Sequence, residues 1–165
     1  MRLPSVLVQT ALCRELDEAA ASCADQPESG GILLGCYRGD NLELTGRTLP
    51  GPSDSRQLFS FIRTDGSHQD AATRTWLESE GTHTWVGEWH THPKGAVSPS
   101  HTDKSSWSKL ARGSGRLMVF ALAVPGEWGL FVVRPSWLRR QTVRLMLVEV
   151  GSTGSVFVEG RSLTM

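Results

Sequence analysis

Residues 89–103 have the sequence WHTHPKGAVSPSHTD, and this stretch decides the fold of the chain. His90 and His92 follow an apolar run of strand character, so we expect them to finish a strand with both imidazoles on one face. Pro93 cannot continue the hydrogen-bonded ladder and turns the chain away. Asp103 lies eleven residues after His92, in the first turn of the helix that we expect to start near Ser98.

A strand end and a helix start can bring two imidazoles and one carboxylate to one point. Three such ligands leave a tetrahedral Zn²⁺ ion one open position, as in catalytic rather than structural zinc sites. Plainer interpretations stay open, because a histidine pair is usually a surface or core feature. Ser100 and Asp103 also have the spacing of a helix capping box. Pro93 and Gly95, in register with the other residues, favour metal binding.

The same positions resemble a known family motif. The spacing of the JAMM motif of MPN/JAB-type metalloproteases is matched by His90, His92, Pro93, Ser100 and Asp103. That motif also has an upstream glutamate before a glycine pair that opens an apolar strand. Glu28 precedes Gly30 and Gly31 in the same way here, and the resemblance covers nearly the whole chain in the order of its elements.

The resemblance implies a role for each matched residue. His90, His92 and Asp103 would be the zinc ligands, and Glu28 would be the general base. Ser100 would donate its hydroxyl to the oxyanion of the intermediate, although it can also cap a helix. Glu88 shares the strand face of His90, so it either orients a histidine or faces solvent. His101 matches no motif position.

The resemblance also implies a fold and a reaction. The fold would be α/β, a single JAB/MPN domain over residues 1–165. A curved mixed sheet would be flanked by about three helices, as in cytidine-deaminase-like proteins. The protein would be a zinc-dependent isopeptidase that hydrolyses the bond after the C-terminal tail of a ubiquitin-like or conjugated protein.

Several partners and rival functions follow from related families. The chain resembles stand-alone bacterial members, some of which accompany ubiquitin-activating-like and ubiquitin-conjugating-like enzymes in anti-phage operons such as CBASS. There the peptidase would release a conjugated nucleotidyltransferase. The alternatives are a peptidase that processes a sulfur carrier, a RadC-like DNA-associated protein and a non-catalytic MPN scaffold. The nucleobase deaminases are excluded because no Pro-Cys-x-x-Cys sequence follows the histidines.

Composition sets broad limits on function. The 165 residues are 39% hydrophobic and 21% charged, as in globular proteins. Seventeen basic and seventeen acidic residues give no overall attraction to nucleic acid or to an anionic membrane. We find no apolar run of membrane-spanning length and no signal peptide, so we expect a cytoplasmic protein. The three cysteines form no C-x-x-C pair, which favours reduced packing residues.

Hydrophobic periodicity and turn residues predict the remaining elements. We expect helices over residues 11–24, capped by Thr10, over 67–80, capped by Asp65 or Ser67, and over 102–110. Residues 50–56 form a polar loop, the best candidate for a mobile segment. The predicted strands cover residues 5–8, 32–37, 42–49, 59–63, 82–89, 117–124, 130–133, 142–150 and 155–159.

Overall fold

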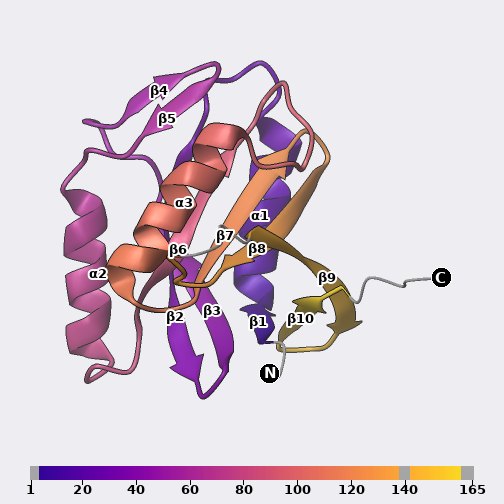
Figure 1. Cartoon of the computed structure of the whole chain (residues 1–165). Coiled ribbons are helices and arrows are strands. Elements are labelled where there is room, and N and C mark those ends of the chain that lie inside the picture. The colour runs from indigo at the N-terminus through magenta and orange to yellow at the C-terminus, as the bar shows by residue number, and fades with distance from the viewer. Residues whose placement is uncertain (1–3, 138–141, 161–165) are drawn as a thin grey trace.

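A computed structural model describes residues 4–137 and 142–160 (Figure 1). The helices are α1 (Thr10–Ser22), α2 (Ser67–Glu78) and α3 (His101–Ser114). The strands are β1 (Ser5–Gln9), β2 (Gly30–Arg38), β3 (Asn41–Arg47), β4 (Ser55–Gln57), β5 (Ser60–Ile62), β6 (Thr84–Thr91), β7 (Met118–Val124), β8 (Glu127–Val133), β9 (Thr142–Val150) and β10 (Gly154–Glu159). None of the helices in these two ranges is both long and apolar enough to cross a bilayer.

The main sheet closes on itself. Its strand order is β1-β10-β9-β8-β7-β6-β2-β3, and β1 completes the ring by pairing parallel to β3 and antiparallel to β10. The predicted α/β class and the three helices agree with the described residues. The predicted curved mixed sheet is instead a closed mixed barrel, because β1 joins strands that are distant in sequence. Hydrophobic alternation within β1 predicts a strand but does not identify its partners.

The two faces of β7 bury two different helices. Val119 and Ala121 belong to the core cluster that contains Leu16 of α1, whereas Phe120 belongs to the cluster that contains Trp107 of α3. Because successive residues of a strand point to opposite faces, α1 and α3 lie on opposite sides of the sheet at this point (Figure 1). The helix that carries Asp103 therefore packs against β7, the neighbour of the strand β6 that carries His90.

Three predicted helix boundaries need correction. Thr10 is the first residue of α1 rather than its cap, and the N-cap position is Gln9, without a side-chain bond. Residues 112–114 continue α3, which ends only at Gly115, in the left-handed region at φ 66°. Glycine adopts that conformation without a Cβ clash, so Gly115 is the true stop signal. Helix α2 begins at residue 67 as predicted but ends at Glu78 rather than at residue 80; its N-cap position is Gly66, and the Asp65 carboxylate accepts a bond from the Ser67 backbone N–H.

Residues 50–56 are fixed by hydrogen bonds rather than being a plain polar loop. The buried Asp54 carboxylate accepts bonds from the backbone N–H groups of Gly51, Thr64 and Asp65, each at 2.8 Å, and lies 2.7 Å from His68 Nε2. His68 is buried, and its Nδ1 lies 2.6 Å from the Thr48 hydroxyl. This network anchors the β4–β5 hairpin, because β4 begins at Ser55, directly after Asp54.

The Asp54 network predicts a pH-dependent contribution to stability. Burial opposes ionisation of Asp54, but the bonds from His68 and the backbone outweigh it and lower its pKa from 3.8 to about 2. A lowered folded-state pKa contributes stability that is present above the unfolded-state value and lost as pH falls through about 2. We expect Asp54→Asn to destabilise the protein by about 2 kcal/mol at neutral pH, and by progressively less between pH 4 and 2.

Urea unfolding of wild type and Asp54→Asn at several pH values measures that difference. The matched control is Asp40→Asn, which changes an exposed residue in the β2–β3 turn and is expected to alter the free energy of unfolding little. A difference between wild type and Asp54→Asn that stays constant down to pH 2 would contradict the assignment.

Candidate active site

Strand β6 delivers both histidines to one face, as predicted. His90 pairs with Gly30 of β2 and with Leu122 of β7, so it is held from both sides. The His92 backbone N–H donates to the Ala123 carbonyl at 2.8 Å, which extends this pairing just past the end of β6. The Nε2 atoms of the two imidazoles lie 3.0 Å apart.

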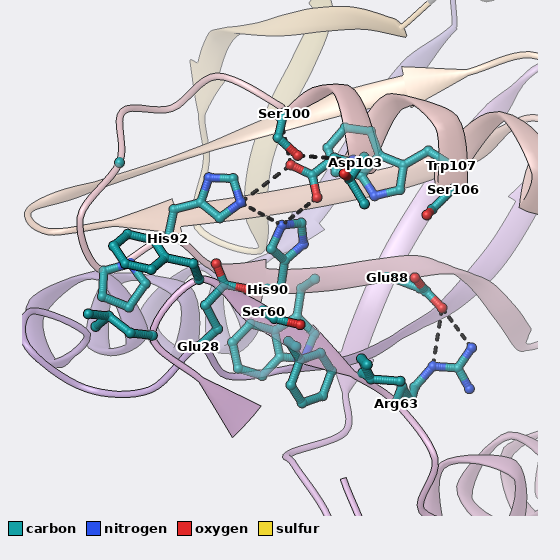
Figure 2. Close-up of a pocket in the computed structure, with 18 of the residues that line it drawn as sticks. Glu28, Ser60, Arg63, Glu88, His90, His92, Ser100, Asp103, Ser106 and Trp107 are labelled. Atoms are coloured by element: carbon teal, nitrogen blue, oxygen red, sulfur yellow. Dashed lines mark hydrogen bonds and ion pairs between the residues drawn. The ribbon is translucent and has the colours of Figure 1, made fainter. Parts of the chain in front are cut away.

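Helix α3 brings the carboxylate to the histidines. Asp103 Oδ1 lies 3.1 Å from His90 Nε2, and its Oδ2 lies 3.3 Å from His92 Nε2. One helical turn later on the same face, Trp107 stacks on Phe120 of β7 with ring centroids 4.5 Å apart. The buried tryptophan fixes the first turn of α3 over the end of β6. The predicted trio therefore converges in space, as Figure 2 shows.

The donor set fits a divalent metal ion. Two imidazole nitrogens and one carboxylate are the ligand types that zinc binds. The two histidine Nε2 atoms are 3.0 Å apart, and one ligand atom from each of the three residues lies within 4.8 Å of the others. Ligand atoms at zinc-binding distance around a tetrahedral ion would be about 3.3 Å apart, so little movement is required.

The charges of these groups support one another. Burial opposes ionisation of Asp103, but hydrogen bonds with His90 and His92 outweigh it and hold its pKa well below the ordinary range. Burial alone would lower the pKa of His92, but the Asp103 carboxylate raises it. The cluster thus pairs an ionised carboxylate with groups that carry or accept positive charge.

Glu28 is brought to the cluster by its neighbour Ser29. The Ser29 backbone N–H donates to the Thr91 hydroxyl at 2.9 Å, and the Ser29 carbonyl accepts from the Thr91 backbone N–H at 2.8 Å. Thr91 lies between the two histidines, so this pairing places Glu28 beside them. The Glu28 residue is only 7% exposed. Burial raises the pKa of its carboxyl, and the charges of His90 and His92 partly offset this.

Ser100 forms the predicted helix cap, whereas its role as an oxyanion donor stays a prediction. Its hydroxyl oxygen accepts from the Asp103 backbone N–H at 3.1 Å, and its own N–H donates to Asp103 Oδ2 at 2.7 Å, which forms the predicted capping box. The Ser100 side chain also hydrogen-bonds the Asp103 carboxylate and helps to lower the pKa of that group, so the hydroxyl is a donor as well. Ser100 also lines the groove at the cluster, where such a donor can reach a ligand.

Glu88 and His101 have different placements. Glu88 Oε1 accepts from Arg63 Nη2 at 2.6 Å and from Arg63 Nε at 3.1 Å, so its partner is an arginine rather than a histidine (Figure 2). The pair joins the end of β5 to β6, and both residues line the groove. His101 is exposed at the first position of α3.

The cluster lies in a groove of about 770 Å³. One wall is the apolar part of the β4–β5 hairpin, formed by Leu58, Phe59, Phe61 and Ile62. A Cβ atom on Gly30 would lie 2.7 Å from the Phe61 ring, so the glycine allows the hairpin to approach the site. The sequence predicts a strand over residues 59–63 but neither β4 nor the contact of Thr91 with Ser29. The glycine pair Gly30–Gly31 is typical of tight backbone geometry. No local pattern identifies Phe61 as the neighbour of Gly30.

Comparison with known proteins gives one family match. The model of the family described as prokaryotic homologs of the JAB domain matches residues 13–143. That range contains both histidines, Asp103, Glu28 and Ser100. It covers α1 from Cys13 onward and all of α2 and α3.

Individual relatives match shorter segments. Proteins of Vibrio cholerae serotype O1 and Pseudomonas aeruginosa, each named CD-NTase/cGAS isopeptidase, are 41% and 38% identical over 83 and 84 residues. These segments are 50% and 51% of this chain and 53% of each relative, so the chain spans about half the length of these curated relatives. The solution structure of protein DSY2949 from Desulfitobacterium hafniense has a TM-score of 0.58 at 18% identity, over 84% of this chain and 88% of that one, which supports the fold alone.

Proposed function

This chain belongs to the prokaryotic homologs of the JAB domain, and on that premise we propose that it is a zinc-dependent isopeptidase of the JAMM type. The observation that carries the proposal is the convergence of His90, His92 and Asp103 beside the buried Glu28 in an open groove. The proposal treats residues 1–165 as one JAB/MPN catalytic domain.

A bound zinc ion would have two effects on the reaction. A Zn²⁺ ion held by His90, His92 and Asp103 would act as a Lewis acid toward the scissile carbonyl and bring the pKa of a water toward neutrality. All three ligands are held against β7. His90 lies on the paired strand β6, the His92 N–H bonds the Ala123 carbonyl, and Asp103 lies on α3, which packs on Phe120 through Trp107. Preorganised ligands avoid reorganisation during the reaction, which supports catalysis rather than mere binding.

Glu28 transfers the proton. A buried carboxylate with a raised pKa is a stronger base than an exposed one. Burial raises the pKa of Glu28, and the charges of His90 and His92 partly offset that rise. In the proposed reaction, Glu28 accepts a proton from the attacking water and returns it to the leaving amine. General acid–base catalysis of this kind contributes roughly 10²–10⁴-fold to rate.

Ser100 stabilises the developing negative charge. In the proposed reaction its hydroxyl, which lines the groove beside Asp103, turns to donate to the oxygen of the tetrahedral intermediate. Ser100 is the N-cap of α3, where the helix dipole also favours negative charge. A donor of this type contributes roughly 2.7–4 kcal/mol.

The groove supports a protein substrate with an extended tail. Its apolar hairpin wall and its openness at the cluster suit a chain segment that runs past the metal ligands. We propose that the tail belongs to a conjugated nucleotidyltransferase, since the curated relatives in two bacteria are named CD-NTase/cGAS isopeptidase. Ubiquitin-activating-like and ubiquitin-conjugating-like enzymes of the same operon would make the conjugate.

The test is cleavage of a defined conjugate. A nucleotidyltransferase joined through its C-terminal residue to a carrier protein is incubated with the zinc-loaded protein and followed by intact mass. We expect release of the nucleotidyltransferase at its terminal residue, inhibition by a chelator, and a kcat lowered roughly 10²–10³-fold in Ser100→Ala with less change in KM. If the protein cleaves only a sulfur carrier, a function in biosynthesis is favoured. If it cleaves no conjugate but binds duplex DNA, the RadC-like alternative replaces the peptidase proposal.

A further inference from the structure

The β4–β5 hairpin holds the backbone of Glu28 on both of its polar groups. The Glu28 N–H donates to the Gln57 carbonyl at 2.8 Å, and the Glu28 carbonyl accepts from Arg56 Nε at 2.9 Å. A second nitrogen of the same guanidinium, Nη2, donates to the Pro27 carbonyl at 3.3 Å. Two donors of one planar group therefore reach two successive carbonyls, which a flexible ammonium could not match.

Glu28 thus lies between two anchors. On one side, Ser29 pairs with Thr91 of the strand that carries the histidines. On the other side, Arg56 and Gln57 bind Glu28 itself. Pro27 has no N–H and Asp25 has a positive φ of 60°, so the segment before Glu28 belongs to no regular element that would fix it. Apart from the hairpin contacts, the segment around Glu28 is held by the Ser29–Thr91 pairing and by the Asp25–Lys94 ion pair.

The hairpin is rigid enough to serve as an anchor. Asp54 binds three backbone N–H groups at its base. Arg63, which follows β5 at the same open end of the hairpin, pairs with Glu88 of β6. The Phe61 ring packs at Gly30, next to the Ser29–Thr91 pairing. The position of Arg56 is therefore fixed relative to the metal-binding cluster, not only relative to Glu28.

We propose that Arg56 is a positioning residue that holds the Glu28 carboxylate at the metal-binding cluster through the Glu28 backbone. The inference rests on the proposed function, because it gives Glu28 the role of base. Arg56 is exposed and is not among the described residues that line the groove, and its guanidinium is bonded to the backbone carbonyls of Glu28 and Pro27. Loss of Arg56 should therefore lower kcat and leave KM nearly unchanged.

The kinetic experiment compares zinc-loaded Arg56→Ala with wild type on the nucleotidyltransferase–carrier conjugate. Small misplacements of a catalytic group are costly, so we expect kcat to fall about tenfold, with zinc content unchanged and partial recovery by free guanidinium ion. Arg38→Ala is the matched control, since Arg38 is also exposed and its Nε pairs with Glu43 at 2.8 Å, away from the groove. It should retain wild-type kcat.

A double substitution identifies the route of the effect. In a Glu28→Gln background, adding Arg56→Ala should cost little further activity, because residues that act through one another are not additive. An equal tenfold loss in both backgrounds would show that Arg56 acts independently of Glu28, and the proposal would be wrong. A rise in KM with constant kcat would make Arg56 a substrate contact and overturn it equally.

Amide hydrogen exchange decides the inference without any substrate. The Glu28 amide, which donates to the hairpin, should exchange several-fold faster in Arg56→Ala than in wild type, whereas the Thr91 amide should be unchanged. Unchanged Glu28 exchange would overturn the positioning role. Failure of wild type to cleave the conjugate would instead contradict the proposed function, and the exchange result would still report on Arg56.

Discussion

Replacing His92 with alanine is expected to leave the purified protein without zinc and without isopeptidase activity. The cluster has three donors, and removal of the His92 imidazole leaves only His90 and Asp103 to hold the metal. The loss of affinity should exceed the roughly 10–100-fold typical of residues that only support a ligand. Elemental analysis of the freshly purified protein gives the zinc content, and intact mass of the conjugate gives the activity.

The matched control for His92→Ala is His101→Ala. His101 is exposed at the start of α3 and makes no contribution to the donor cluster. It should keep about one zinc per chain and full activity. Zinc retained in His92→Ala, or absent from freshly isolated wild type, would remove this metal site from the proposal.

Glu28→Gln is expected to keep zinc and lose activity by roughly 10²–10⁴-fold, the range for a general acid–base group. The amide preserves the volume of the buried side chain, which is 7% exposed as a residue, but it cannot accept a proton from water. Because Glu28 is outside the donor cluster, its loss should leave the three metal ligands in place. The measurements are single-turnover cleavage of the conjugate and zinc content on the same sample.

Glu18→Gln is the control for Glu28→Gln, as it removes an exposed carboxylate on α1. Two results would contradict the role of Glu28. Loss of zinc together with activity would make Glu28 a ligand or a structural residue. Full activity in Glu28→Gln would exclude it from proton transfer, whatever its burial.

The sequence by itself determined the local arrangement around the metal-binding residues. Alternation places His90 and His92 on one strand face, and the capping box places Asp103 in the first turn of α3. These features depend on backbone preferences over a few residues, so a single chain segment encodes them. The structure confirms that the three side chains converge, and their catalytic roles stay predictions.

The position of Glu28 was predictable only through the family resemblance. Sixty-two residues separate it from His90, and nothing in its own neighbourhood specifies the approach. The structure supplies the reason in the Ser29–Thr91 pairing and in the glycine at position 30, which leaves space for Phe61. Composition and periodicity could not have shown either contact.

Tertiary structure alone decided the closure of the barrel and the anchoring of the β4–β5 hairpin. β1 has the same alternating pattern whether it lies at an edge or between β3 and β10. Arg56 and Asp54 resemble ordinary polar loop residues in sequence, yet one binds the Glu28 backbone and the other binds three backbone N–H groups. Strand partners and side-chain-to-backbone bonds depend on register between distant segments, and many registers satisfy the same local pattern, so only the folded chain selects one.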